Sequence, residues 1–327
     1  MKRGFYNILC AQSLSSIADN ALLIAAIALL ASLQAPEWMT PLLKLFFVVS
    51  YVLLAAWVGI FADLLPKGHV MFITNAIKAV GCLMMLFGSH PLLAYAVVGI
   101  GAAAYSPAKY GILTELLPPE KLVIANGWME GLTVVSIILG VLLGGVLVHE
   151  DVAQFLLHTV GLSSFGMTLE AQAAIAVVVL VYVLAAIVNL TIPDTGARYP
   201  KPDFKPVASI VNFIDSCRLL WHDKLGQISL SVTTLFWGAG AVLQFLVLKW
   251  AAEALGMNLS QGAVLQAVVS IGIALGATGA AAFVPLKKSL VVLPMGIAMG
   301  LVVGAASYFN QTMLPGSLSI MGVEVRW

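Results

Sequence analysis

The sequence contains few charged residues. Asp, Glu, Lys and Arg make up 9% of its 327 residues, whereas 61% are hydrophobic, and the mean hydropathy is +1.02. Soluble globular domains carry about 25% charged residues, so this composition excludes an ordinary soluble domain. The net charge of +1 averages over both sides of any membrane and indicates no particular partner. The sequence therefore predicts a protein that crosses a membrane several times.

Residues that build catalytic and metal sites are also scarce. The chain has three cysteines and five histidines. Their spacing gives no disulfide framework, no Cys/His cluster and no HExxH pair. No nucleophile stands beside a base, and no basic surface is interleaved with aromatic residues for nucleic acid. We therefore expect no metal site, no cofactor, no enzymatic activity and no nucleic-acid partner.

Long apolar stretches dominate what remains. A window of about 19 residues finds segments long enough to cross a bilayer. The first of these segments has full span length and shows no cleavage site, so we expect it to stay in the mature protein. The sequence predicts an all-α polytopic membrane protein with about nine transmembrane helices, near 7–32, 42–62, 69–88, 92–114, 123–148, 172–192, 227–249, 263–285 and 290–308.

Lysine and arginine fall on one side of these spans. They occur at the start of the chain and in alternate loops, whereas the loops near 34–41, 89–91, 149–171 and 251–262 carry none. Loops that keep positive charge are cytoplasmic. We therefore expect a cytoplasmic N-terminus.

A polar segment divides the chain into halves. Residues 194–226 are rich in proline and charge, and within them Val207, Ile210 and Ile214 recur at helical spacing with polar residues on other faces. This pattern is typical of an amphipathic helix at a membrane surface. We expect a six-helix half at 1–193, a cytoplasmic linker with this helix at 194–226, and a second half at 227–327. This layout resembles that of the major facilitators, whose two halves rock around a site at the membrane midplane.

Glycines at four-residue spacing occur within several spans. Small residues at this spacing let membrane helices approach closely. We expect tight helix packing at Gly140 and Gly144, at Gly272 and Gly276, and at Gly296, Gly300 and Gly304.

Four ionisable residues lie inside predicted spans of the first half: Asp19, which precedes Asn20, together with Lys78, Lys109 and Glu130. A charge at the bilayer centre costs about 3 kcal/mol on insertion scales, so each needs a partner or a polar cavity. The four balance in sign, which leaves two interpretations open, an internal network of paired charges or a pathway for a polar ligand. For Lys78 we favour a structural partner or a lateral contact with lipid headgroups.

Lys109 has the most informative neighbours. Pro107 removes a backbone donor two residues earlier, which tends to kink a helix and aim side chains toward a cavity. Tyr105 and Tyr110 flank the lysine, either as the lining of a headgroup site or as packing residues. A kinked helix that carries a lysine suits an anionic headgroup.

The loop after the second span carries a further motif. Gly59 is followed by Asp63 and Lys67 in GIFADLLPK, which resembles the loop motif of the major facilitators. That resemblance implies that the glycine allows close helix approach and that the acid pairs with a base or caps a helix to close one gate. Pro66 stands where the family usually has glycine. The alternative is a solvated turn.

Four longer stretches carry a more specific resemblance. GIGAAAYSPAKYGILTEL, together with AQSLSSIADNALL, ANGWMEGLT and TLFWGAG, is similar to the bacterial lysophospholipid transporters, a family of major facilitators, over about Cys10 to Leu301. The resemblance implies a flippase that moves lysophospholipids of the ethanolamine and glycerol types across the inner membrane to the cytoplasmic leaflet. An acyltransferase, or acyl-ACP synthetase, partner would restore the missing chain there.

The same resemblance implies which residues meet the substrate. Asp19, Asn20, Lys109 and Glu130 become candidate headgroup contacts. Such a lipid offers a phosphate to Lys109 and, when it carries ethanolamine, an ammonium to Asp19. Its acyl chain would stay among apolar side chains or lipids.

The sequence also departs from the family. Major facilitators have twelve spans, and the residues after about Tyr308 are too short and mixed to cross, so we expect an incomplete second half. Gln244 stands where relatives carry arginine. Three interpretations remain: a lysophospholipid transporter, a major facilitator that exports another amphiphile, or a truncated remnant without transport activity.

Overall fold

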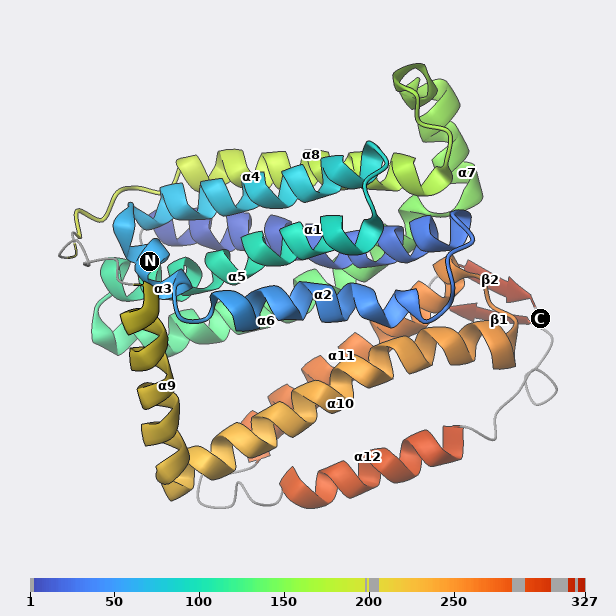
Figure 1. The fold of residues 1–327 in the computed structure, drawn as a ribbon. Helices are drawn as coiled ribbons and strands as arrows, with labels where there is room; N and C mark the ends of the chain where they lie inside the picture. The colour runs from blue at the N-terminus through green and yellow to red at the C-terminus, as the bar shows by residue number, and fades with distance from the viewer. Residues whose placement is uncertain are drawn as a thin grey trace. The chain divides into compact units, whose positions relative to one another are not determined.

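The computed structural model describes residues 3–197, 199, 206–283, 292–306, 317–320 and 323–326. The chain divides into two compact units, Met1–Ile228 and Ser229–Trp327, shown together in Figure 1.

The first unit is built from long apolar helices. Six of the predicted spans correspond to α1 (Arg3–Ser32), α2 (Met39–Leu54) with α3 (Val58–Leu64), α4 (Lys67–Leu86), α5 (Pro91–Leu116), α6 (Pro119–Leu147) and α8 (Glu170–Leu190). Between α6 and α8 lie α7 (Glu150–Gln154), the π-helix η1 (Phe155–Thr159) and the 3₁₀-helix η2 (Leu162–Phe165). Helix α9 (Pro206–His222) follows, so the amphipathic helix predicted in the linker is present.

These long helices run side by side as a bundle (Figure 1). Helix α1 packs against α6 and α8, α4 packs against α5 and α8, and α2 packs against α5. One buried apolar cluster joins α1, α4, α5 and α6 through Phe5, Met71, Ile112 and Met129. The bundle thus brings the ionisable residues of α1, α4, α5 and α6 inside one six-span unit.

The second span differs from the prediction of one helix over 42–62. Helices α2 and α3 meet at a bend of 71°, with turn residues at 55–57 between them. Nothing in the local sequence indicates this break, because alanine at 55 and 56 is the best helix former. The break coincides with a contact from outside the span, since the Trp57 indole donates a hydrogen bond of 3.3 Å to the Pro206 carbonyl at the start of α9.

Two of the predicted glycine contacts join α6 to α1. A Cβ added to Gly140 would lie 2.5 Å from the Ile17 carbonyl oxygen, and one added to Gly144 would lie 2.8 Å from the Ile24 Cβ. This close approach confirms the prediction for α6. Among the described residues of the second unit, added Cβ atoms would meet nothing within 4 Å at Gly272, Gly276, Gly300 and Gly304 and only an ordinary contact at Gly296, so tight packing there stays a prediction.

The described residues of the second unit form most of α10 (Lys224–Leu255), which begins in the first unit, then α11 (Leu259–Phe283), α12 (Val292–Ala306), β1 (Ser317–Ile320) and β2 (Val323–Arg326). The strands pair antiparallel with Ser317 opposite Arg326. The sequence did not predict this sheet. Six described helices are long and apolar enough to cross a membrane, α2 with α3 gives a seventh, and α11 and α12 contain shorter apolar stretches.

Candidate functional site

Asp19 forms an ion pair inside the first unit. The Lys78 Nζ atom on α4 lies 2.8 Å from Oδ1 and 2.9 Å from Oδ2 of Asp19 on α1. The Tyr182 hydroxyl on α8 donates a hydrogen bond of 2.7 Å to the same Oδ1. Three helices therefore converge on one carboxylate. The two charges therefore pair with each other, which is one of the two arrangements that the sequence left open.

The surroundings of Lys78 hold it in this place. Its side chain is 1% exposed, whereas that of Asp19 is 26% exposed. Lys78 also donates a hydrogen bond of 3.0 Å to the Ser15 hydroxyl, which donates to Asn75 Oδ1 at 2.8 Å. A Cβ added to Gly101 on α5 would lie 2.7 Å from Lys78 Cγ, so only glycine leaves room for the lysine stem. We call Asp19 and Lys78 the buried pair.

Tyr105 lies beside the buried pair. Its ring centroid lies 5.1 Å from Lys78 Nζ, and its side chain is 4% exposed. A cation above an aromatic face is stabilised by the ring quadrupole. Tyr105 is therefore placed to stabilise the ammonium of Lys78.

Asn20 lies at the contact between α1 and α6. Its amide donates a hydrogen bond of 2.9 Å to the Ser16 carbonyl of its own helix. A Cβ added to Gly140 would lie 2.8 Å from Asn20 Cβ. The residue is thus adjacent to Asp19 in sequence but occupies a helix packing contact.

Lys109, Tyr110 and Glu130 form a second cluster, which we call the open cluster. Lys109 Nζ on α5 lies 4.4 Å from the centroid of the Tyr110 ring. The Tyr110 hydroxyl donates a hydrogen bond of 2.7 Å to Oε1 of Glu130 on α6. The Tyr110 side chain is 42% exposed and Glu130 is exposed, whereas Lys109 is 8% exposed. The cluster thus combines an exposed phenol and an exposed carboxylate with a buried ammonium.

Lys109 and Tyr110 of the open cluster closely follow the internal proline of α5. The helix continues through Pro107, and the Ser106 hydroxyl donates a hydrogen bond of 3.2 Å to the Ala102 carbonyl. The side chains of Tyr105 and Tyr110 are five residues apart and serve different clusters. The sequence alone left both possibilities open for these two tyrosines.

Lys67 is the centre of a third group at the start of α4. Its Nζ atom pairs with the Asp63 carboxylate, donates a hydrogen bond of 2.9 Å to the Ala62 carbonyl and lies 3.9 Å from Glu115 Oε1. Its side chain is 5% exposed. The acid and base of the loop motif therefore pair directly, which excludes the solvated turn for Lys67.

Gly59 does not make the close helix contact that the motif implied. Among the described residues, no heavy atom lies within 4 Å of a Cβ added at this position. The glycine of this chain that does face the lysine is Gly111 on α5, where an added Cβ would lie 3.3 Å from Lys67 Cε.

Glu115 ties the segment after α8 to this group. The Thr195 hydroxyl donates a hydrogen bond of 2.6 Å to Oε2 of Glu115, and the Tyr199 hydroxyl donates one of 2.9 Å to Oε1. The hydrogen bond to Glu115 is the main cause that raises the pKa of the Tyr199 phenol above its usual 10.0, so the phenol stays a donor at neutral pH. The Tyr199 ring also lies 4.9 Å from Lys67 Nζ. We call Asp63, Lys67, Glu115, Thr195 and Tyr199 the end latch.

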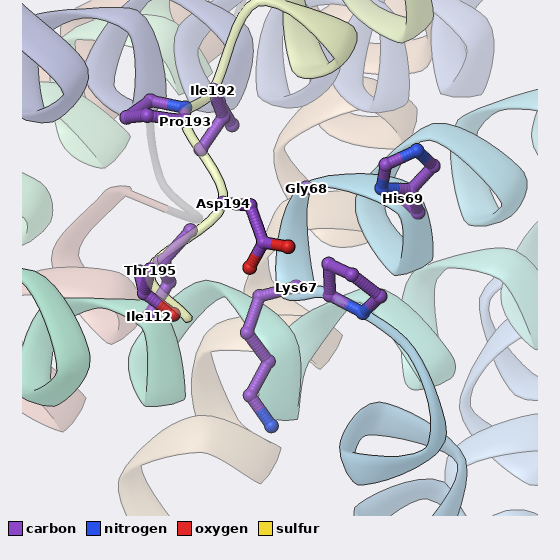
Figure 2. Close-up of a pocket in the computed structure, with 9 residues that line it drawn as sticks. Lys67, Gly68, His69, Ile112, Ile192, Pro193, Asp194 and Thr195 are labelled. Carbon is purple, nitrogen blue, oxygen red and sulfur yellow. The ribbon is translucent and has the colours of Figure 1, made fainter. Parts of the chain in front are cut away.

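A small cavity lies beside the end latch. Figure 2 shows its two sides, the start of α4 at Lys67, Gly68 and His69, and the segment from Ile192 to Thr195. The cavity encloses about 20 Å³, which is enough for one water molecule. It is therefore too small for a phospholipid headgroup and belongs to the end latch.

Sequence reasoning missed several residues that complete these groups. Tyr182 and Ser15 gave no signal, because a polar residue within an apolar span has no visible partner until the helices pack. Glu115 and Thr195 are 80 residues apart in sequence. Glu115 and Ser15 do lie in recognised stretches, GILTEL at the end of α5 and AQSLSSIADNALL in α1, but a stretch alone does not name a partner. Among the described residues, no group of three His, Cys, Asp or Glu side chains is arranged to hold a metal ion.

The sequence of this chain is similar to those of known membrane proteins. The sequence profile of the Major Facilitator Superfamily matches residues 8–324. The lysophospholipid transporter LplT of Yersinia pestis (strain Pestoides F) is 42% identical over 312 residues, which cover 95% of this chain and 72% of the relative. The protein of the same name from Yersinia pseudotuberculosis serotype O:3 (strain YPIII) shows the same identity and coverage.

Two solved structures share the fold. Both are of a bacterial homologue of the human lysosomal transporter Spinster in an inward-facing conformation. The occupied form matches with a TM-score of 0.61 and 17% identity over 87% of this chain, and the unoccupied form with 0.57 and 20% over 87%. This chain spans 62% and 64% of the length of those structures. At this identity the similarity concerns the fold.

Proposed function

Because this chain belongs to the lysophospholipid transporters of the major facilitator superfamily, we propose that it moves lysophospholipids across a membrane by alternating access. The observation that carries the proposal is 42% identity to lysophospholipid transporters over 95% of the chain. Two halves that rock around a site near the midplane are the general mechanism of this fold.

The open cluster is the proposed headgroup site. Every lysophospholipid carries a phosphate, and Lys109 offers an ammonium from inside a membrane span. A charge-assisted hydrogen bond between the two would be strong where water is scarce. The exposed phenol of Tyr110 and the exposed carboxylate of Glu130 supply further polar contacts.

Asp19, Asn20 and Tyr105 are the other proposed headgroup contacts of the first unit. Asp19 holds the ammonium of Lys78, and Tyr105 packs over that ammonium. Asn20 fixes the contact between α1 and α6, and α6 carries Glu130. Through these contacts the same residues also help to set the positions of α1, α4, α5 and α6.

The end latch is the proposed gate of the first half. Lys67 joins Asp63, at the end of α3, to Glu115, at the end of α5. Thr195 and Tyr199 extend the same group into the segment that leads to the second half. Breaking these contacts would free the helix ends to move when the transporter changes conformation.

The cellular setting follows from the distribution of lysine and arginine. We propose a bacterial inner membrane, a cytoplasmic N-terminus and delivery to the cytoplasmic leaflet, where an acyltransferase or acyl-ACP synthetase would re-acylate the product. The latch lies at the end of the bundle where α1 begins, because a Cβ added at Gly4 would lie 2.7 Å from the ring of Pro193, beside the latch segment. The latch would thus be the cytoplasmic gate.

The test is uptake of radiolabelled lysophosphatidylethanolamine by bacteria that lack their own transporter and retain the acyltransferase. Wild-type chain, Lys109→Ala and a control, Lys121→Ala, are compared at equal amounts in the membrane. We expect uptake by the wild type and Lys121→Ala, and at least a tenfold loss in Lys109→Ala, since hydrogen bonds to charged groups contribute about 1.5–3 kcal/mol. Uptake of an unrelated amphiphile, without competition from the lipid, would indicate a different exporter. No uptake by a well-inserted wild-type chain would contradict lipid transport.

A further inference from the structure

The segment between α6 and α8 takes no part in the three groups described above. It consists of α7, η1, η2 and the turns between them, and we call residues 149–169 the outer segment. Five spans precede it, which is an odd number, so it lies across the membrane from the N-terminus. Figure 1 shows it in green at the end of the bundle opposite the beginning of α1. With the proposed cytoplasmic N-terminus, this segment faces outward.

Large apolar side chains are exposed on the outer segment. Phe155 and Val160 are both exposed, and Phe165 is 80% exposed. In η1 the Val160 amide donates a hydrogen bond of 3.1 Å to the Phe155 carbonyl, which places these two residues one turn apart. Exposed apolar patches mark contacts with lipid or with another protein. The outer segment therefore has a surface that water solvates poorly.

Other contacts hold the outer segment against the ends of the spans. Ala153 and Leu157 are buried, and α7 packs against α8. The Gln154 amide donates a hydrogen bond of 3.2 Å to Oε1 of Glu170, the first residue of α8. The exposed apolar side chains thus stay at the level where α6 ends and α8 begins, which is the surface of the membrane.

Two glycines fix the turn that carries Phe165. Gly161 and Gly166 flank η2 with φ values of +85° and +82°, a backbone conformation that favours glycine. The Ser164 amide donates a hydrogen bond of 3.1 Å to the Gly161 carbonyl, and the Gly166 amide donates one of 3.0 Å to the Ser163 carbonyl. The exposed phenylalanine therefore lies on a turn with a defined backbone.

The neighbouring span shows which partner continues from this surface. Exposed apolar residues recur along α8 at helical spacing, at Leu180, Leu184 and Ile187. Because α8 is long and apolar enough to cross a membrane, such a stripe contacts the acyl chains of lipids. The outer segment leads directly into this helix and projects past it in Figure 1. The lipid that surrounds α8 is thus the nearest cover for the outer segment.

Charge indicates the kind of lipid. Segments that bind anionic lipids carry lysine and arginine on their polar face. The outer segment has neither, and Glu150 and Asp151 in α7 are exposed acids. His149 Nδ1 lies 3.7 Å from Oδ2 of Asp151. Two carboxylates beside an apolar patch favour headgroups without net charge.

We propose that the outer segment is an interfacial element that inserts Phe155, Val160 and Phe165 into the outer leaflet, among zwitterionic phospholipids. Interfacial segments bury their apolar face roughly 5–10 Å deep, at the boundary between headgroups and acyl chains. The contact holds the outer ends of α6 and α8 at the lipid surface. This inference uses the proposed orientation and does not depend on the transported substrate.

The experiment places a nitroxide label on Phe165→Cys or on the control Ser163→Cys, an exposed position of the same turn, in a Cys10→Ser, Cys217→Ser background. Each variant is studied as one copy per nanodisc of phosphatidylcholine, so that no second copy covers the segment. Oxygen concentrates in the bilayer, whereas a neutral nickel chelate stays in water. Insertion of roughly 5–10 Å should make the label at 165 about fivefold or more less accessible to the chelate than the label at 163, while oxygen reaches it readily.

Three results in nanodiscs would overturn the inference. Equal access of the chelate to both labels would place the outer segment in water. Protection of the label at 165 from oxygen and chelate alike would mean that protein covers it. Stronger protection from the chelate in nanodiscs with added phosphatidylglycerol would contradict the preference for zwitterionic lipid. In each variant Cys82, which is fully buried, should stay unreactive toward a thiol probe, which verifies that the bundle is folded.

Labelling in cells tests the side of the membrane. In cells with a permeabilised outer membrane, an impermeant maleimide should react with Ser163→Cys while the inner membrane is intact. Reaction only after the inner membrane is opened would overturn the assignment to the outer leaflet. None of these measurements requires transport, so absence of lipid uptake would overturn the proposed function and leave the lipid contact of the outer segment standing.

Discussion

Asp19 and Glu130 illustrate what a sequence reveals about single residues. Both are acids within apolar helices, and the sequence marked both as needing a partner. Whether that partner is a buried lysine or a tyrosine depends on which faces of α1, α4, α5 and α6 meet. Charge balance among the four ionisable residues left open whether they pair or line a pathway, and it did not indicate which residue joins which.

The buried pair gives a prediction at this scale. In Asp19→Asn, Lys78 is left buried without its counter-charge, which should destabilise the protein by about 3–5 kcal/mol. The double variant Asp19→Asn with Lys78→Met should recover part of that loss, because it removes the unpaired ammonium as well. Stability is measured in detergent by heating and following the reaction of Cys82, which is fully buried on α4, with a thiol probe in a Cys10→Ser, Cys217→Ser background.

The control for this comparison of single and double variants is Lys121→Met, which removes an exposed lysine from the first turn of α6. It should leave the unfolding temperature unchanged. If the effects of Asp19→Asn and Lys78→Met simply added in the double variant, the two side chains would not interact energetically.

At the scale of elements, hydropathy predicted where the helices lie but not how they are shaped. Each of the nine predicted spans overlaps a described helix. The bend between α2 and α3 was not predicted. It coincides with a hydrogen bond from Trp57 to Pro206, and a partner 149 residues away leaves no mark on the local sequence. The helix at Pro206–His222 was predicted correctly from its periodicity. Its position at the membrane surface stays a prediction.

The contact between α1 and α6 gives a prediction at the element scale. Gly140→Val would place new atoms against the Ile17 backbone, which cannot retreat, so α6 would be pushed away from α1. Overpacking of this kind costs about 1–3 kcal/mol. We expect a lower unfolding temperature and less protein in the membrane.

The matched control on the same helix is Gly131→Val, where added atoms meet open space. Its unfolding temperature should stay within a few degrees of the wild type. A similar loss in both variants would mean that valine disturbs α6 itself and that the contact with α1 is unimportant.

At the scale of the whole molecule, the sequence predicted the class, the fold and the family, and these predictions are confirmed by the superfamily profile and by 42% identity to lysophospholipid transporters. These features depend on overall hydropathy and on contiguous motifs, which a sequence displays directly. The end latch was only half predicted. Asp63 and Lys67 lie within one motif, whereas Glu115, Thr195 and Tyr199 join it only after folding. The division into halves and a linker, and the assignment of the site residues, stay predictions.

The end latch gives a prediction at this scale. Lys67→Ala removes the ammonium that faces Asp63 and Glu115, which should release the segment after α8 from the start of α4. Ile192 in this segment is 7% exposed. We expect a cysteine placed there to react with a maleimide about tenfold faster or more in Lys67→Ala than in the wild type, in a background without Cys10 and Cys217.

Lys121→Ala serves as the control, since it removes a lysine that takes no part in the latch. Unchanged reactivity in Lys67→Ala would show that the segment is held by other contacts. The Tyr199 phenol should remain a donor throughout the physiological range, because its pKa is raised above 10.0. The ratio of the reactivities of Lys67→Ala and wild type should therefore be the same at pH 6 and at pH 8, because the ionisation of the cysteine itself affects both variants alike.

The buried pair also constrains how the chain is made. Asp19 and Lys78 are 59 residues apart, so Asp19 leaves the ribosome first. At about 5–20 residues per second, roughly 3–12 s pass before its partner is synthesised. During this interval α1 carries an unpaired acid, and its high hydropathy must offset that cost for insertion to proceed. Biogenesis of this protein should thus include a waiting period, in which α1 stays at the insertion machinery until α4, the third span, is made.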